Sequence, residues 1–379
     1  MSVFSVPAAD VRDADDWQFL LVKSKAMLNN LIGLRFYAAL WVFLYHFFPV
    51  YTDLPKVDLL EVGYLGVDVF FVLSGFILTY VYYGKFFVNK ISIKDYYNFI
   101  IKRFAKIYPL HFILTLIFIP LLFVGKYVFH QDALKVYPNT LINNFLLIHA
   151  WGTTSHYSWN FPSWSISAEW FAYLFLFAPA AFIYRKSRLV FFIVCVVILG
   201  AFMWKWIKIP EFTMDRYTMN GLPRIIPEFL LGVLAGLLKL KVILNKKMAS
   251  FIFMLALLFL SLFFYQRFYF QQLCIFGFAA IIFALSYDTY FNKLFGSRQL
   301  IYLGNISYAF YLTQFLSLII YEQVYRLLFS KLTTEYIVIL QFLIAFSINF
   351  IMASSAYRYI EEPVRLYLVK KLSRNKINR

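Results

Sequence analysis

The stretch that decides the fold is residues 31–51, LIGLRFYAALWVFLYHFFPVY, in which Arg35 and His46 are the only basic side chains. As an α-helix it would be about 30 Å long, which matches the hydrocarbon core of a bilayer. A soluble helix would need a polar face, and this run has none. The stretch therefore predicts a transmembrane helix.

The rest of the chain has the composition of a membrane protein. Of its 379 residues, 62% are hydrophobic and only 15% are charged, whereas a soluble domain has roughly half and a quarter. Ten apolar runs are long enough to span, at 31–52, 64–84, 106–125, 166–184, 189–207, 222–240, 249–266, 269–287, 303–325 and 335–360. They are too long for β-barrel strands and do not alternate. The predicted fold is an all-α transmembrane bundle of about ten spans.

The net charge of +17 is explained by topology. With the N-terminus placed inside, the inner loops and tails hold 24 Lys and Arg and the outer loops hold nine, which leaves Arg35, Arg224 and Arg358 within spans. The positive-inside rule then predicts that both termini are cytoplasmic. The excess charge points to membrane lipid as the partner and not to nucleic acid.

Three regions follow from these assignments. Residues 1–28 form a polar cytoplasmic extension without the apolar region of a cleaved signal. Residues 29–366 form the transmembrane domain, and 367–379 a basic cytoplasmic tail. The run 141–151 is too short to cross and is predicted to be interfacial or re-entrant. The two cysteines, Cys195 and Cys274, have no metal-ligand spacing, so no metal site is expected.

Arg35 and His46 share one face of the first predicted span. They are separated by three helical turns, about 16 Å. An arginine at one end of a long ligand could bind its phosphates while the imidazole acts at the other end. In the alternative interpretation, Arg35 reaches the inner headgroups and His46 is an interfacial hydrogen-bonding residue. Both interpretations remain open from the sequence.

Two carboxylates inside spans are candidates for function, because ionisable groups there are costly. Asp68, in GVDVFFVLSGF, lies close in depth to His46 and could hold the imidazole as a general base. Glu169 shares a helical face with Ser165 and Tyr173. One hypothesis places both carboxylates in a cavity with His46. The alternative for Asp68 is a charge favoured by the dipole of a helix N-terminus.

Arg103 and Lys106 are three residues apart at the predicted cytoplasmic entry of the third span. Paired cations at that depth suit the phosphates of a nucleotide arriving from the cytoplasm. The alternative is that both residues serve only as a positive-inside anchor.

Other polar positions have structural interpretations. Arg224 and Glu228 are spaced i, i+4, as an intrahelical ion pair would be. Glu361 and Glu362 stand among many lysines, which favours a salt-bridge site over a catalytic one. Gly75 is predicted to permit close helix contact.

Seven segments, taken together and in order, resemble the acyltransferase 3 family of integral membrane proteins. They are LRFYAALWVFLYH (34–46), GVDVFFVLSGF (66–76), RFAKIYP (103–109), WSISAEWF (164–171), LPRIIPEFLLGVLAG (222–236), ISYAFYL (306–312) and YIEEPVR (359–365). The resemblance covers about residues 29–366.

The resemblance implies an enzyme that transfers an acyl group, most often acetyl from acetyl-CoA, to a hydroxyl of a glycan. It implies that Arg35 and His46 are the essential pair, that Arg103 and Lys106 bind the donor, and that Glu169 is a functional acid. The acceptor would be a glycan or a lipid-linked glycan. Separately from the resemblance, the many Lys, Asn and Ile residues and the lack of a signal sequence fit a bacterial inner membrane. Two departures stand out: the family commonly has arginine at the position of Lys106 and histidine at that of Gln314.

Two other classes of function are compatible with the composition. A transporter or flippase for a lipid-linked glycan would use the intramembrane charges as a substrate path, but no inverted repeat is evident. A non-catalytic scaffold would leave those charges unexplained. Nothing in the pattern predicts an oligomeric state.

Overall fold

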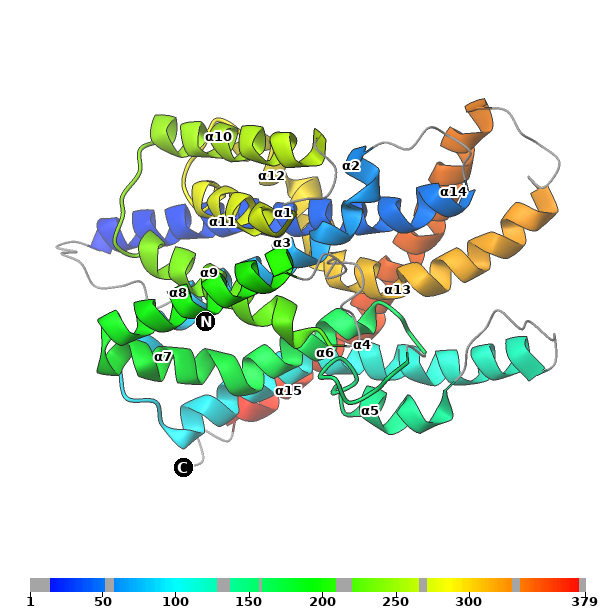
Figure 1. The fold of residues 1–379 in the computed structure, drawn as a ribbon, viewed down its shortest axis with the longest axis horizontal. Coiled ribbons are helices and arrows are strands. Elements are labelled where there is room, and N and C mark those ends of the chain that lie inside the picture. The colour runs from blue at the N-terminus through cyan, green and yellow to red at the C-terminus, as the bar shows by residue number, and fades with distance from the viewer. Residues whose placement is uncertain are drawn as a thin grey trace.

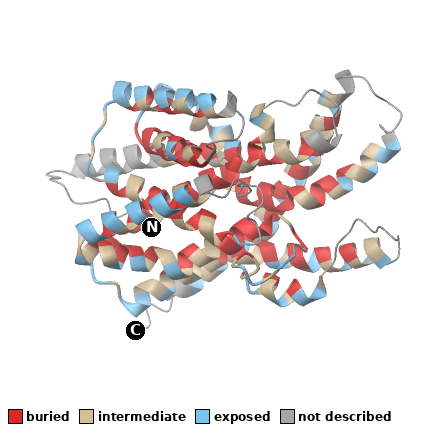
Figure 2. Ribbon diagram, viewed as in Figure 1, coloured by how far each residue is buried: buried red, intermediate tan, exposed pale blue. Residues whose placement is uncertain are grey.

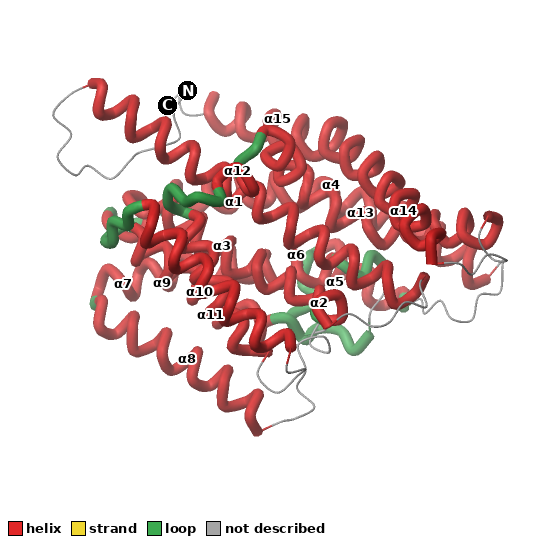
Figure 3. Tube along the Cα trace, turned by 90° about the horizontal axis from the view of Figure 1, so that it is seen from above, coloured by secondary structure: helices red, strands yellow, loops and turns green. Residues whose placement is uncertain are grey.

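The structure is a computed structural model that describes residues 14–51, 58–127, 137–156, 159–208, 220–265, 271–328 and 335–374. In these ranges the regular structure is helical (Figure 3), apart from one isolated bridge between Trp151 and Asn220. The prediction of an all-α protein is therefore confirmed.

The helices are arranged as one bundle. In chain order they are α1 (Ala14–Tyr51), α2 (Asp58–Glu61), η1 (Gly63–Leu65), α3 (Gly66–Tyr82), η2 (Tyr83–Val88), α4 (Ile93–Tyr127), η3 (Pro138–Thr140), α5 (Leu141–Phe145), α6 (Ser163–Phe171), η4 (Ala172–Leu176), α7 (Phe177–Lys186), α8 (Arg188–Lys208), α9 (Leu222–Lys239), α10 (Lys246–Tyr265), η5 (Gln271–Leu273), α11 (Cys274–Leu285), α12 (Asn292–Phe295), α13 (Arg298–Leu328), α14 (Glu335–Ala356), η6 (Tyr357–Glu361) and α15 (Glu362–Arg374). Most of the long helices run along the long axis, and the C-terminal α14 to α15 crosses the others obliquely (Figure 1).

Each of the ten predicted runs contains a helix. Among the described residues, eight helical stretches are long and apolar enough to cross a membrane: Leu28–Phe48, Gly63–Val88, Ile93–Tyr127, Ser163–Lys186, Arg188–Lys205, Lys246–Phe263, Arg298–Leu327 and Val338–Lys371. The other two runs correspond to α9, which carries Arg224, Glu228 and Lys239, and to the 12-residue α11. The chain is a multi-pass membrane protein, and ten spans with cytoplasmic termini stays a prediction.

The helix surfaces explain the high apolar content. On α8 and α10 the large apolar side chains that face outward are exposed (Figure 2), among them Val190, Ile193, Val196, Val197, Phe251, Leu255, Leu258 and Leu262. In water such a surface would be unfavourable, whereas in a bilayer it contacts lipid tails.

Helices α3 and α9 approach each other closely because each has a glycine at the contact. A Cβ atom on Gly75 would lie 2.1 Å from the carbonyl oxygen of Phe229, and one on Gly232 would lie 2.0 Å from that of Val72. The prediction for Gly75 is confirmed. The contact aligns the two helices and brings polar residues near their starts together.

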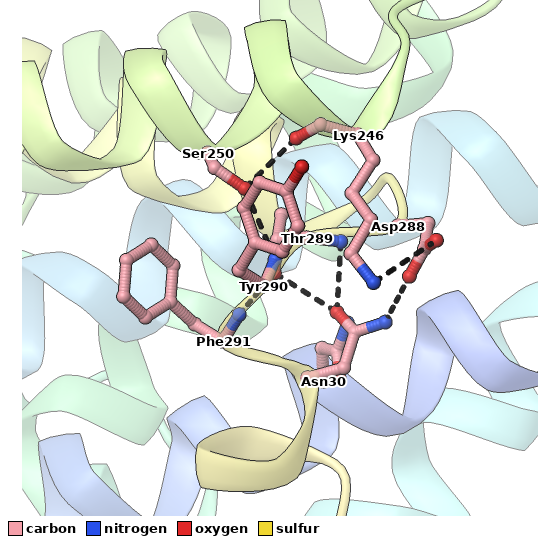
Figure 4. A network of polar contacts seen from close by, with 8 residues as sticks. Asn30, Lys246, Ser250, Asp288, Thr289, Tyr290 and Phe291 are labelled. Atoms are coloured by element: carbon pink, nitrogen blue, oxygen red, sulfur yellow. Dashed lines mark hydrogen bonds and ion pairs between the residues drawn. The ribbon is translucent and has the colours of Figure 1, made fainter.

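A polar network joins α1, α10, the segment between α11 and α12, and the start of α12 (Figure 4). Asn30 donates to Asn292 over 2.9 Å, Lys246 lies 3.8 Å from Asp288, and Ser250 accepts from the Tyr290 amide. The positive-inside count assigns these segments to one side of the membrane. Their proximity agrees with that assignment.

The segment 137–156 does not cross the bundle. It contains the short α5 and is held from both sides, since His111 of α4 bonds the Asn144 carbonyl at 2.8 Å and Ser167 of α6 accepts from the Ala150 amide. His149 lies 3.1 Å from the Ser163 hydroxyl, and burial lowers the pKa of this imidazole to about 3. The segment therefore packs against α4 and α6. Because His111 bonds its backbone, His111 has a structural role here.

Candidate functional site

A small cavity lies where α1, α3, α4, α6, η4 and α13 meet. Its volume is about 150 Å³. We call it the cationic cavity, because Arg35, Arg103 and Lys106 all line it. The other polar lining residues are Ser74, Ser165, Glu169, Tyr173, Tyr308 and Tyr311. The three cations predicted to meet the same ligand are thus brought together from two helices.

Aromatic rings surround the Arg103 guanidinium. Its central carbon lies 5.8 Å from the ring of Tyr82, 5.9 Å from Phe99 and 6.0 Å from Tyr173. Cation–π contacts hold a guanidinium in place without neutralising its charge. Neither Arg35 nor Arg103 forms an ion pair with a carboxylate in the described part of the chain. Both charges therefore remain available to an anion.

Lys106 differs from the two arginines because it already has an acidic partner. Its ammonium donates to Glu361, which is fully buried, and lies 5.3 Å from the ring centre of Tyr308. Glu362 makes a two-point contact with Arg365. The interpretation of both glutamates as salt-bridge residues is confirmed. Much of the Lys106 charge is balanced within the protein.

Glu169 faces the cationic cavity through a local network. It accepts a hydrogen bond from the Tyr173 hydroxyl, which lies 3.2 Å from the Ser74 hydroxyl. Tyr173 belongs to η4, a π-helical turn between α6 and α7. Turns of this kind often occur at functional sites. The predicted stripe of Ser165, Glu169 and Tyr173 is confirmed, since all three line the cavity.

Asp68 is not paired with His46. Its two oxygens accept from Arg224, at 2.8 Å from Nε and 2.6 Å from Nη2, and both side chains are buried. Glu228 lies 4.0 Å from the same guanidinium. The structure does not show His46 paired with Asp68 or with Glu169, as the hypothesis required. Asp68 bonds Arg224, and Glu169 bonds Tyr173. The Arg224–Glu228 pair exists but is the longer contact.

His46 lies between two further cavities. The middle cavity, about 240 Å³, is lined by Val42, Tyr45, His46, Tyr64, Val67, Phe161, Pro162, Trp164, Arg224 and Tyr311. The apolar cavity, about 1170 Å³, lies between α4 and α13. Its lining is His46, Ile117, Pro120, Leu121, Leu122, Val124, Gly125, Phe161, Pro162, Gln314, Phe315, Leu318, Ile319, Ile320, Glu322, Gln323 and Arg326.

The three cavities are neighbours in series. Val67 and Tyr311 line both the cationic and the middle cavity. His46, Phe161 and Pro162 line both the middle and the apolar cavity. The Arg35 end and the His46 end of α1 therefore face adjoining spaces, as their shared helical face predicts.

Several participants have no local signature in the sequence. Glu361 meets Lys106 across 255 positions, and Tyr82 reaches Arg103 from α3, whereas Phe99 lies on α4 itself, one turn before Arg103. Tyr308 lies within the ISYAFYL segment, but nothing in its sequence context distinguishes it from other tyrosines on an apolar helix face. In the described ranges no group of three or more His, Cys, Asp or Glu is placed to hold a metal ion.

Comparison with known proteins identifies the family. Residues 28–358 match the family model of the acyltransferase domain. The acyltransferase MdmB of Streptomyces mycarofaciens is 31% identical over 155 residues, which is 39% of this chain and 38% of that relative. No solved structure matches. The chain belongs to the acyltransferase 3 family of membrane proteins.

Proposed function

We propose that the protein transfers an acyl group, acetyl from acetyl-CoA in the first instance, to a hydroxyl of a cell-surface or secreted glycan. The observation that carries the proposal is the series of cavities, which has two unpaired arginines at one end and an imidazole at the other. A long anionic thioester donor fits this polarity. The protein would act as a membrane-bound O-acyltransferase in a bacterial inner membrane.

The donor would enter by the cationic cavity. At about 150 Å³ this space is smaller than the roughly 300–1,000 Å³ of a pocket for a whole drug-sized ligand. It suits the narrow pantetheine arm, with the phosphates held by Arg35 and Arg103, which line it. In the ten-span topology these arginines lie near the cytoplasm, which is the side from which acetyl-CoA would bind.

The chemistry would take place at His46. The imidazole removes the proton of the acceptor hydroxyl as its oxygen attacks the thioester carbonyl. The carbon–sulfur bond breaks, an ester forms, and the CoA thiolate leaves and takes up the proton from His46. No metal ion is required for this step. Glu169 lines the cationic cavity and would therefore act close to the bound donor.

The proposal is tested by incubating membranes that contain the protein with radiolabelled acetyl-CoA. We expect label to enter glycan, and we expect His46→Ala to abolish incorporation at normal expression. His156→Ala is the matched control, since His156 is exposed and lines none of the cavities. Normal labelling by His46→Ala would overturn the mechanism. Translocation of a lipid-linked glycan without any labelling would favour the flippase alternative.

A further inference from the structure

The apolar cavity is larger than donor binding requires. Its walls come from the second half of α4 and from α13, and apolar side chains predominate in both, such as Leu121, Phe315 and Leu318. Polar side chains occur in two groups: His46 with Gln314, and Glu322 with Gln323 and Arg326 further along α13. A free sugar would leave most of these walls without a suitable partner.

Gln314 supplies an independent observation. The side chain is 1% exposed, and within the described ranges neither its amide nitrogen nor its amide oxygen has a hydrogen-bond partner. Buried amides are almost always bonded at both ends, because an unsatisfied one is costly. Gln314 lines the same cavity as His46. A side-chain amide has N–H donors on its nitrogen and an acceptor oxygen, so it can both donate to and accept from a hydroxyl group.

We propose that the apolar cavity binds the acyl acceptor, and that the acceptor is an amphiphile. Its hydroxyl-bearing part would bond Gln314 beside His46, and its apolar part would lie against α4 and α13. This inference rests on the proposed function and adds the chemical class of the acceptor. Gln314 then acts as a positioning residue, which holds the attacking oxygen next to the base.

The test uses purified full-length protein in vesicles with radiolabelled acetyl-CoA. Two acceptor sources are compared, a chloroform–methanol extract and an aqueous extract of the same cells. We expect label to enter the organic extract. Mild acid then separates two amphiphiles: a carrier lipid linked through phosphate releases the label into water, and any other lipid-like alcohol retains it. Both outcomes support the proposal.

Gln314→Leu tests the positioning role. We expect the half-saturating amount of organic extract to rise about tenfold while that of acetyl-CoA is unchanged, a split that a general loss of structure would not produce. Gln341→Leu is the matched control, since Gln341 is a buried glutamine of α14 that lines none of the three cavities. Leu318→Trp, which fills the cavity, should also impair only the use of the extract.

Three results would overturn the proposal. Label that enters only the aqueous extract would leave the acyltransferase intact and exclude an amphiphilic acceptor. Gln314→Leu and Leu318→Trp proteins that both match Gln341→Leu would exclude the apolar cavity as the acceptor site. Label that enters neither extract would contradict the proposed function itself.

Discussion

The guanidinium of Arg224 donates two hydrogen bonds to the carboxylate of Asp68, and this pair joins α9 to α3 where both side chains are buried. Arg224 also stacks over Trp164, 5.1 Å from the ring centre, and lines the middle cavity with His46. Asp68 therefore shapes the surroundings of the histidine through Arg224 and not by direct contact.

Removal of Arg224 should destabilise the protein strongly. Arg224→Leu leaves Asp68 and Glu228 buried without a cation, and a broken buried pair costs about 3–5 kcal/mol. Thermal unfolding in detergent should show a large fall in Tm. Arg326→Leu is the control, because that arginine is 64% exposed and its pair with Glu322 is worth at most about 1 kcal/mol. Equal Tm values for the two variants would contradict the structural role of the pair.

Lys106 should contribute mainly to stability, through its ion pair with Glu361, and less to donor binding. Lys106→Met alone strands the buried carboxylate of Glu361 and should lower Tm. The double variant Lys106→Met with Glu361→Gln removes both charges and should recover most of that loss. Unfolding measurements on the two single variants and the double variant give the coupling between the residues. A double variant as unstable as Lys106→Met would argue against a coupling between Lys106 and Glu361.

Arg103 should be needed for donor affinity. Arg103→Ala removes an unpaired guanidinium from the cationic cavity, and we expect the Kd for acetyl-CoA to rise at least about tenfold, or 1.4 kcal/mol. Binding to the detergent-solubilised protein can be followed with labelled donor. Lys102→Ala is the matched control, since it removes the neighbouring cation of α4, which does not line the cavity. Unchanged affinity in Arg103→Ala would rule out this role.

The contact between α3 and α9 should not tolerate a single methyl group. In Gly75→Ala the new carbon would lie 2.1 Å from the Phe229 carbonyl, so the helices must move apart at a cost of about 1–3 kcal/mol. Gly84→Ala meets no atom within 4 Å and should be neutral or slightly stabilising. Tm values of the two variants provide the comparison.

Much of the fold could be predicted because the bilayer imposes length and polarity on each span. Each of the ten runs contains a helix, and the cations expected to share a ligand do share a cavity. Helical spacing also gave the correct face for Ser165, Glu169 and Tyr173. These inferences use only local geometry.

The partners of the charged residues could not be predicted in the same way. Asp68 was expected at His46 because the two are close in depth, yet Arg224 offers a formal positive charge and a two-point contact that a neutral imidazole does not. Likewise the Lys106 partner lies 255 positions away. Depth in the membrane follows from sequence, but rotation and neighbourhood depend on how distant helices pack.

The π-helical turns have a consequence for comparing this chain with its relatives. An α-helix repeats every 3.6 residues, and a π-helical turn inserts an extra residue. In η4 the insertion sets α7 about 100° out of phase with α6. A relative that lacks one residue there would keep Glu169 in place but turn Phe177 out of its stack with Phe99. Gaps in an alignment at Ala172–Leu176 or Tyr357–Glu361 are therefore changes of helix face, not of loop length.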